Sequence, residues 1–382
     1  MDRKLTRRVF VGIATAAIAV ATATIAVRAG HEMPVYPSYY PQEIRIEPMS
    51  PAAAAEALAK ARIQAYVGGA PAFAGNPGAT ISSVQSLRAF LVVRVNPDSP
   101  AAKDNAGRCK IAKAVIGAVA GDAAGFRLHP YPITPLHADY FHHADLAWAA
   151  AARHQGKADA FPGLKVAATG PLAEILARRH WPAQDWDARI DEIGLDALLA
   201  PHRIEINGWN GPPWLKEGWY HAYRLLADGL VDEAARTKAA DGLRRLQQGD
   251  FAAPEEKINL ERDLVGLLAG NCRLVVMGYA VRREFYSAEY SSGVENIAFD
   301  SLDGFNSAIF IRTVKLKDFP WNGWLTLGID GEPRAAWNPV GGFTDPAGRL
   351  IWHALGDPGL FPEPYNAGWN MNRIGDVKRT PR

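Results

Sequence analysis

Apolar residues are spaced differently in the two parts of the chain. Up to about residue 270 they mostly recur with the period of an amphipathic helix. The helices predicted in this way lie near residues 109–121, 136–154, 171–179, 213–228, 231–247 and 255–269. Ser50 and Pro51 supply an N-cap and a first helical position for an earlier helix, which we expect to run to about Tyr66. Two apolar runs, Arg88–Val95 and Leu164–Ala168, favour strands instead.

After Gly270 the pattern becomes that of short strands separated by turn residues. The predicted strands are Arg273–Val281, Glu284–Tyr290, Ala308–Val314, Trp324–Ile329 and Arg349–Ala354. Strands grouped apart from helices favour an α+β fold over alternating βαβ units. We therefore predict an α+β fold, with a helix-rich N-terminal part followed by a strand-rich C-terminal part. A boundary between two subdomains could fall near residues 250–270.

The first thirty residues have the organisation of a targeting segment. Basic residues, Arg3, Lys4, Arg7 and Arg8, precede nineteen uncharged residues from Val9 to Val27. A helix of that length would just cross a bilayer core of about 30 Å. A small-residue ending at Ala29 suits a signal peptidase, and the basic flank indicates that the N-terminus stays inside. This predicts an N-terminal transmembrane or signal helix over residues 1–30.

The stretch Thr6-Arg7-Arg8-Val9-Phe10-Val11 resembles a twin-arginine export signal, with paired Arg before an Ala-rich apolar segment. The resemblance implies export in a folded state to the periplasmic side of a bacterial inner membrane. Two alternatives remain open at this stage. The chain is either released by cleavage near Ala29 or held in the membrane by an uncleaved anchor.

Composition limits what the rest of the chain does. Residues 31–50 hold four prolines and three tyrosines, and a fifth proline follows at position 51. This composition predicts an extended linker, which leaves 51–382 as the periplasmic domain. The net charge is only +2, and no basic stripe is present, so nucleic-acid binding is excluded. The phosphate-loop, dinucleotide, serine-hydrolase and zinc-protease motifs are all absent.

The chain has two cysteines, Cys109 and Cys272, which exclude a disulfide-rich scaffold and a cysteine-based metal cluster. In an oxidising compartment the two could form one disulfide across a very long loop, which requires Cα atoms within about 7 Å. The alternative is a pair of buried free thiols.

The densest group of potential metal ligands is His137, Asp139, His142 and His143, with Asp145 close behind. On one helix Asp139 would face both His142 and His143. Imidazole and carboxylate ligands suit Zn²⁺ or another divalent first-row ion, and His129 or His353 could complete the set. The alternative is a polar helix face with no ligand.

Tryptophan recurs beside asparagine and glycine, and eleven Trp is high for this length. Flat rings beside amide groups could bind a sugar or another small molecule, or anchor a protein partner. The candidate ligand-binding residues are Trp209, Asn210, Trp321, Trp324, Trp337 and Trp369. The alternative is that these rings cover the core beneath loops.

These patterns favour a membrane-tethered or exported periplasmic binding or accessory protein that serves as a subunit of an envelope complex. Its partners would be other envelope proteins or a small-molecule or sugar ligand. The alternative is an exported enzyme, metal-dependent or carbohydrate-active. A glycosidase would need a carboxylate pair, for which Asp300 or Asp303 could partner Glu284 or Glu289. The alternative for these carboxylates is surface charge pairing.

Overall fold

The computed structural model describes residues 41–122, 125–154, 161–182, 186–201, 204–206, 209–318, 323–334, 345–356 and 360–371. They belong to one compact unit, Tyr40–Arg382. The predicted targeting segment and most of the predicted linker lie outside the described residues. None of the helices in the described part is both long and apolar enough to cross a membrane.

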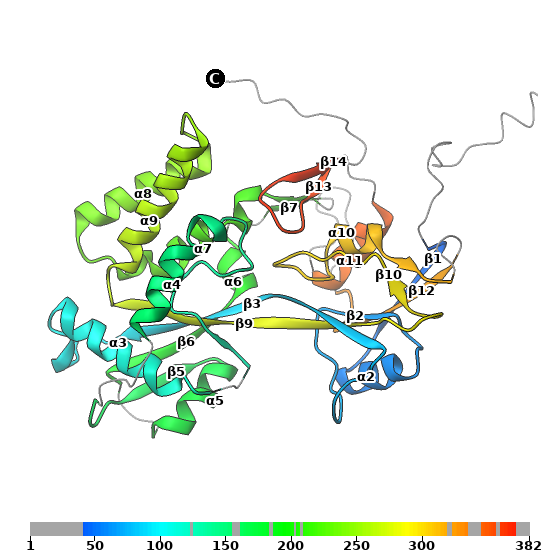
Figure 1. Ribbon diagram of the computed structural model, residues 1–382, viewed down its shortest axis with the longest axis horizontal. Coiled ribbons are helices and arrows are strands. Elements are labelled where there is room, and N and C mark those ends of the chain that lie inside the picture. The colour runs from blue at the N-terminus through cyan, green and yellow to red at the C-terminus, as the bar shows by residue number, and fades with distance from the viewer. Residues whose placement is uncertain are drawn as a thin grey trace, which may run out of the picture. The chain divides into compact units, whose positions relative to one another are not determined.

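Helices and strands are intermixed along the described residues (Figure 1). The α-helices are α2 (Pro51–Ala59), α3 (Asn105–Val119), α4 (Ala144–Arg153), α5 (Pro171–His180), α6 (Leu195–Leu199), α7 (Gly218–Leu226), α8 (Glu233–Gln248), α9 (Pro254–Ala269), α10 (Ala308–Thr313) and α11 (Pro346–Leu355). The short 3₁₀ turns are η1 (Pro100–Ala102), η2 (Tyr140–His142), η3 (Pro213–Lys216) and η4 (Ala227–Gly229). The strands are β1 (Glu43–Pro48), β2 (Ala65–Val67), β3 (Ile81–Val95), β4 (Arg127–Leu128), β5 (Val166–Thr169), β6 (Ala188–Gly194), β7 (Ile204–Ile206), β8 (Trp209–Gly211), β9 (Leu274–Ser287), β10 (Val294–Glu295), β11 (Lys315–Leu316), β12 (Trp324–Ile329), β13 (Leu360–Pro362) and β14 (Trp369–Met371).

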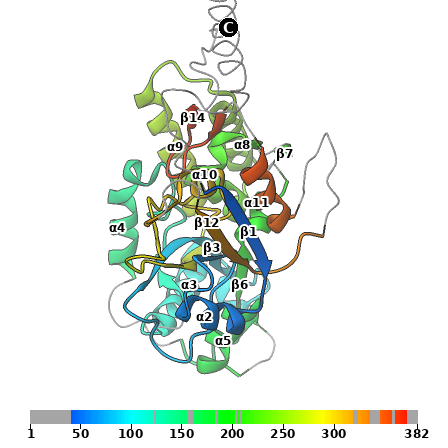
Figure 2. The same cartoon turned by 90° about the vertical axis from the view of Figure 1, so that its right-hand side faces the viewer.

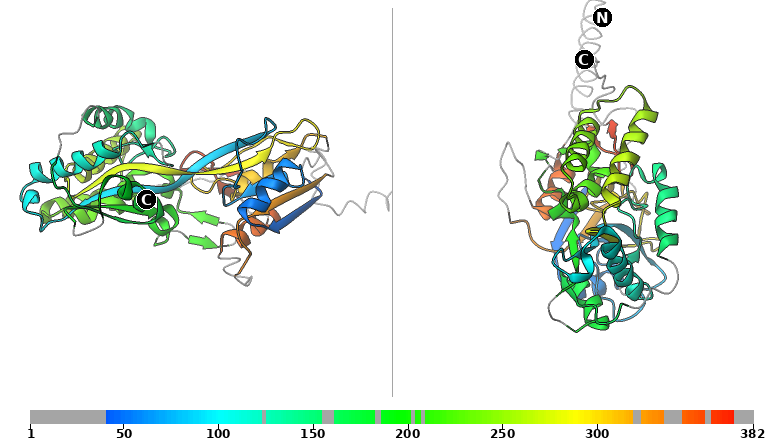
Figure 3. Two further views of the ribbon diagram at one scale, coloured as in Figure 1. Left: turned by 90° about the horizontal axis from the view of Figure 1, so that it is seen from below. Right: turned by 90° about the vertical axis from the view of Figure 1, so that its left-hand side faces the viewer.

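One mixed sheet of eight strands organises the described residues, in the order β1-β12-β2-β9-β3-β6-β5, with β4 also paired to β9. The long antiparallel pair β3 and β9 forms its centre, and the two strands run side by side through both halves of the molecule (Figure 3). The pairs β1–β12, β12–β2 and β5–β6 are parallel, whereas β6 and β2 pair antiparallel with the central strands.

Helices cover both faces of the sheet at the end that contains β5 and β6. Alternate residues of β3 explain this, because successive side chains of a strand point to opposite faces. Phe90 and Val92 pack in a core with residues of α4 and α6–α9, whereas Leu91 and Val93 pack in another core with residues of α3 and α5. Such two-sided burial accounts for the unbroken apolar run 89–93 within β3.

The other end of the sheet, formed by β1, β12 and β2, is also covered on both faces. One core contains Leu325 and Leu327 of β12 with Phe310 of α10 and Leu350 of α11. A smaller core packs α2 against Tyr66 and Phe285. In Figure 2, accordingly, α2 and α11 lie on opposite sides of β1 and β12.

The prediction of mixed α and β content is confirmed, but the segregation of helices before strands is wrong. Strands β1–β6 of the main sheet all lie within the first 194 residues, and α10 and α11 come from the last part of the chain. In the region 250–270, α9 leads directly into β9 at the centre of the sheet.

Three local predictions are also wrong. Residues 43–48 of the predicted linker form β1, which pairs along its whole length with β12. The first helix ends at Ala59 instead of about Tyr66, since Ala65–Val67 pairs in the sheet. The predicted strands 308–314 and 349–354 are helices α10 and α11.

Cys109 and Cys272 form a disulfide, with a Cα–Cα distance of 4.9 Å. The bond joins α3 to the turn between α9 and β9, and 163 residues separate its ends. The Cα distance lies within the limit that the sequence-based expectation required. The alternative of two free thiols is not what the structure contains.

Candidate functional site

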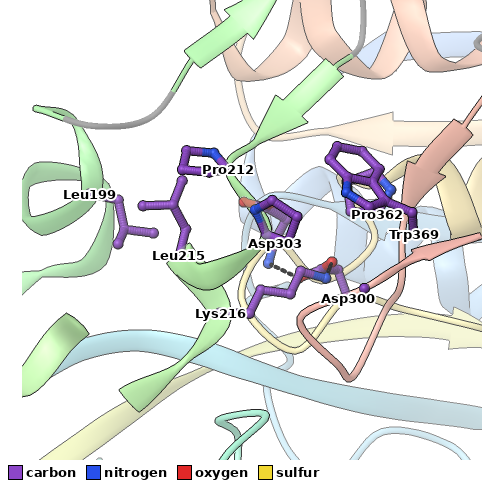
Figure 4. Close-up of a pocket in the computed structure, with 10 residues that line it drawn as sticks. Leu199, Pro212, Leu215, Lys216, Asp300, Asp303, Pro362 and Trp369 are labelled. Carbon is purple, nitrogen blue, oxygen red and sulfur yellow. Dashed lines mark hydrogen bonds and ion pairs between the residues drawn. The ribbon is translucent and has the colours of Figure 1, made fainter. Parts of the chain in front are cut away.

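A pocket lies where three distant segments of the chain meet, and we call it the Trp369 pocket (Figure 4). Its walls are mainly apolar, and Lys216, Asp300 and Asp303 supply its polar groups. The empty volume between the walls is about 430 Å³, part of it open to solvent. The residues that line it are Leu199, Pro212, Pro213, Leu215, Lys216, Asp300, Asp303, Pro362, Gly368 and Trp369.

A buried ion pair forms the polar side of this pocket. The ammonium of Lys216 pairs with the Asp300 carboxylate and also donates to the carbonyl of Glu363, next to β13. The Asp300 carboxylate further accepts from the backbone N–H groups of Leu302 and Asp303. Burial raises the pKa of Asp300, and the Lys216 charge opposes this rise. The pair thus connects η3, the 300–303 turn and the β13–β14 hairpin.

The structure separates the candidate tryptophans. Trp369 lines the pocket, and Trp209 and Asn210 lie in β8, directly before the pocket residues Pro212 and Pro213. Trp324 lies elsewhere, 62% exposed on β12 with the Arg45 guanidinium 5.7 Å from its ring centre. Trp321 and Trp337 lie outside the described residues. A single platform formed by Trp324 and Trp369 is therefore not what the structure contains.

The histidine-rich segment is not one helix. Asp139 precedes the short turn η2, and α4 begins only at Ala144. The spacing argument from one continuous helix is therefore wrong. Asp139 and His143 nevertheless lie close together and buried, and the third group beside them is Glu261 of α9. Neither His129 nor His353 belongs to this group.

His137 does not belong to this group and is hydrogen-bonded to Thr134 and His221 instead. The N–H of Thr134 donates to His137 Nδ1 at 2.8 Å, which places the ring proton on Nε2. That proton is donated to His221 Nδ1 at 2.9 Å, and His221 Nε2 in turn donates to the Leu215 carbonyl at 2.7 Å. Burial lowers the pKa of both rings, to about 4 for His221, so the pair is neutral. With both nitrogens engaged, His137 is not available as a metal ligand.

His142 is hydrogen-bonded to Glu261 and is itself partly exposed to solvent. Its Nδ1–H donates to Glu261 Oε2 at 2.8 Å, and its side chain is 35% exposed. The neighbouring Asp145 lies outside the cluster, because its carboxylate is paired with both guanidinium nitrogens of Arg262 at 2.8 Å. Glu261 is not evident from the sequence, because Lys257 and Glu261 at i,i+4 spacing have the pattern of an exposed helix pair.

The carboxylates proposed for a glycosidase pair have other roles. Glu284 is completely buried and accepts from the backbone N–H groups of Gly68 and Phe305 at 2.6 and 2.7 Å. Burial raises its pKa to about 7. Asp300 is held by Lys216, as described above. Glu284 therefore ties β9 to two loops, and its geometry gives it no access to a substrate.

No described protein family and no curated protein matches the sequence. Among solved structures, the chain is similar to NikA from Brucella suis in complex with Fe(III)-EDTA, at 13% identity and a TM-score of 0.40, over 70% of this chain and 60% of that one. It is also similar to the oligopeptide-binding protein AppA from Bacillus subtilis in complex with a nonapeptide, at 13% identity and a TM-score of 0.36, over 70% and 58%. DppA from Helicobacter pylori in complex with the peptide STSA gives 10% identity and a TM-score of 0.37, over 69% and 54%. The chain spans about half to three fifths of the length of these proteins. At this level of similarity, the matches identify neither a family nor a ligand for the chain.

Proposed function

We propose that the chain is an exported binding protein that holds a small ligand in the Trp369 pocket. The observation that carries the proposal is the pocket itself, where an indole ring, apolar proline and leucine walls and a buried ion pair converge from three segments. Pockets for small molecules are typically apolar, of about 300–1,000 Å³, with a few fixed polar groups. The Trp369 pocket has such apolar walls and such polar groups, whereas the cavity that its walls enclose is smaller, about 30 Å³.

The lining indicates the class of ligand. Trp369 and Pro362 offer flat apolar surface, which suits the face of a sugar ring or an apolar side chain of a short peptide. Asp303 and the Lys216–Asp300 pair offer charged groups at the same site. Lys216 is immobilised by two partners, so the polar side of the pocket is formed before a ligand arrives.

Two observations support an extracytoplasmic location. The Cys109–Cys272 disulfide suits an oxidising compartment, since such bonds are rare in the bacterial cytoplasm. The basic and apolar pattern of residues 1–30 is typical of an export segment. We also propose that the protein is a subunit of an envelope complex on the periplasmic side of the inner membrane. There it is either tethered by residues 1–30 or released by cleavage near Ala29.

Native mass spectrometry of protein isolated from its own cells tests the binding function. We expect a fraction of the wild-type protein to carry one additional small mass that collisional activation removes. Trp369→Ala should lose this mass, whereas Trp148→Ala should keep it, because Trp148 is 70% exposed on α4, away from the pocket. A ligand-free wild type, or equal loss in both variants, would contradict the proposal.

A fusion of β-lactamase after Arg382 tests the location, because this reporter confers ampicillin resistance only outside the cytoplasm. We expect an active fusion, and Arg7→Lys with Arg8→Lys should abolish its activity if export uses the twin-arginine signal. An inactive wild-type fusion would contradict export. Unchanged activity in the double variant would assign the segment to an ordinary signal or anchor.

A further inference from the structure

The part of the structure with the strongest unexplained chemistry is the buried group of Asp139, His143 and Glu261, which does not contribute to the Trp369 pocket. One ligand atom from each residue lies within 4.8 Å of the other two. The three residues are 1%, 0% and 0% exposed, respectively. Among the described residues, His143 Nε2 has no hydrogen-bond partner, although it is completely buried. A buried nitrogen without a partner is costly and calls for a ligand.

Each of the three side chains is held in place by a second group. The hydroxyl of Tyr131 lies 3.0 Å from His143 Nδ1 and so orients the ring, leaving Nε2 as the free nitrogen. The backbone N–H groups of Gly218 and Trp219, at the start of α7, donate to the two oxygens of Asp139 at 2.6 and 3.1 Å. Each carboxylate oxygen retains a second lone pair. Side chains that bind metal ions are typically oriented in this way, by hydrogen bonds to neighbouring groups that do not bind the ion.

Glu261 is oriented in the same manner, by Lys257 and His142. Lys257 Nζ lies 2.6 Å from Glu261 Oε1, and His142 Nδ1 donates to Oε2. Lys257 also pairs with the buried Glu217 at 2.5 Å. Glu217 accepts in addition from the indole N–H of Trp219. The supporting shell therefore extends from α9 to the start of α7.

The charges around this group do not balance. Three buried carboxylates, Asp139, Glu217 and Glu261, are matched by the single ammonium of Lys257. The nearby Arg262 does not compensate, because its guanidinium is already paired with Asp145 and donates to the His142 carbonyl. A buried excess of negative charge is unfavourable unless protons or a cation neutralise it.

We infer that Asp139, His143 and Glu261 bind one divalent first-row metal ion. One imidazole and two carboxylates suit Zn²⁺, with bonds of about 2.0–2.2 Å. Ligands of a four-coordinate ion lie about 3.4 Å apart at such bond lengths, so the three side chains must close by roughly 1 Å on binding. Because the site is buried, the ion has a structural role and joins α9 to the segment before α4.

The test uses full-length, tag-free protein stripped of metal with a chelator and titrated calorimetrically with ZnCl₂. We expect one Zn²⁺ per chain with micromolar or tighter affinity, and a rise in thermal midpoint that grows with zinc concentration. His143→Gln should weaken binding at least about 100-fold. His180→Gln, which removes an imidazole paired with Asp122 elsewhere on the surface, should bind like the wild type.

X-ray absorption at the zinc edge keeps the inference testable if His143→Gln does not fold. The zinc-loaded wild type should show one imidazole among oxygen ligands. Absence of stoichiometric binding, equal weakening in His180→Gln, or two or more imidazoles around the ion would each overturn the site.

Discussion

Substitution of Gly304 by alanine should destabilise the protein through a contact with Glu284. Gly304 has φ +65°, and a Cβ atom there would lie 1.8 Å from Glu284 Oε2. Contacts of this kind essentially never fall below 3.0 Å, so the carboxylate would have to move by more than 1 Å. That oxygen accepts from the Phe305 N–H at 2.7 Å inside a completely buried environment.

The expected cost has two parts. The left-handed backbone costs an alanine about 1–2 kcal/mol. Displacement of Glu284 adds the loss of a buried hydrogen bond to a carboxyl group, about 1.5–3 kcal/mol. Gly163→Ala is the matched control, because its φ of +74° is similar but nothing lies within 4 Å of its Cβ position. Gly304→Ala should therefore reduce the free energy of unfolding by about 2 kcal/mol more than Gly163→Ala does.

Urea unfolding followed by tryptophan fluorescence measures both variants against the wild type. A double-mutant cycle with Glu284→Ala isolates the contact, since the extra cost of Gly304→Ala should disappear when the carboxylate is absent. If the two glycine variants differ by less than about 0.5 kcal/mol, or if the extra cost persists without Glu284, the reasoning is wrong.

Three further predictions concern stability. Burial raises the pKa of Glu284 to about 7 from an ordinary 4.5. Its contribution to the free energy of unfolding is therefore complete below about pH 4.5 and is lost as the pH rises through 7. Glu284→Gln should remove about 3 kcal/mol of that pH dependence in urea titrations, whereas a profile parallel to the wild type would contradict the assignment. The Cys109–Cys272 disulfide links residues 163 positions apart, so its reduction should lower the free energy of unfolding by about 5 kcal/mol through chain entropy. An unchanged thermal midpoint in dithiothreitol would contradict this stabilising role. Asp232 caps α8 by accepting from the Ala235 N–H at 2.8 Å, so Asp232→Ala should lower the urea-derived stability by about 1 kcal/mol, and no measurable loss would refute the capping role.

The longer helices could be predicted because their signals are local. Periodicity and flanking residues placed α5, α8 and α9 within two residues of their observed ends. Capping groups and apolar spacing act over a few residues, so the sequence contains them directly. The central strand β3 was predicted only in part, from Arg88 instead of Ile81, since its first residues are polar and only partly buried.

Short apolar runs were the source of the errors. Residues 308–313 and 346–355 are apolar enough for buried strands, yet they form α10 and α11. Asp345 and Pro346 have the composition of a turn, but they are the N-cap and first position of α11. Arg282 and Arg283 appeared to divide two strands, whereas β9 continues through them as a partner of β3. Runs of this length do not distinguish helix from strand without their neighbours.

Local composition indicates which segments are rich in candidate ligand groups. It identified Asp139 and His143 by their density, Trp369 by its Trp-Asn context, and Cys109 with Cys272 as the only cysteine pair. Those signals are compositional and local, and they need no knowledge of the fold.

Which of these residues meet depends on the long-range packing of the chain. Glu261 reaches His142 across 119 positions of sequence, and Lys216 reaches Asp300 across 84. The same packing removed His137 from the candidate ligands by pairing it with His221. These contacts depend on the order of strands in the sheet and on which helix face is buried. Both result from long-range burial of apolar surface, which no short window of sequence specifies.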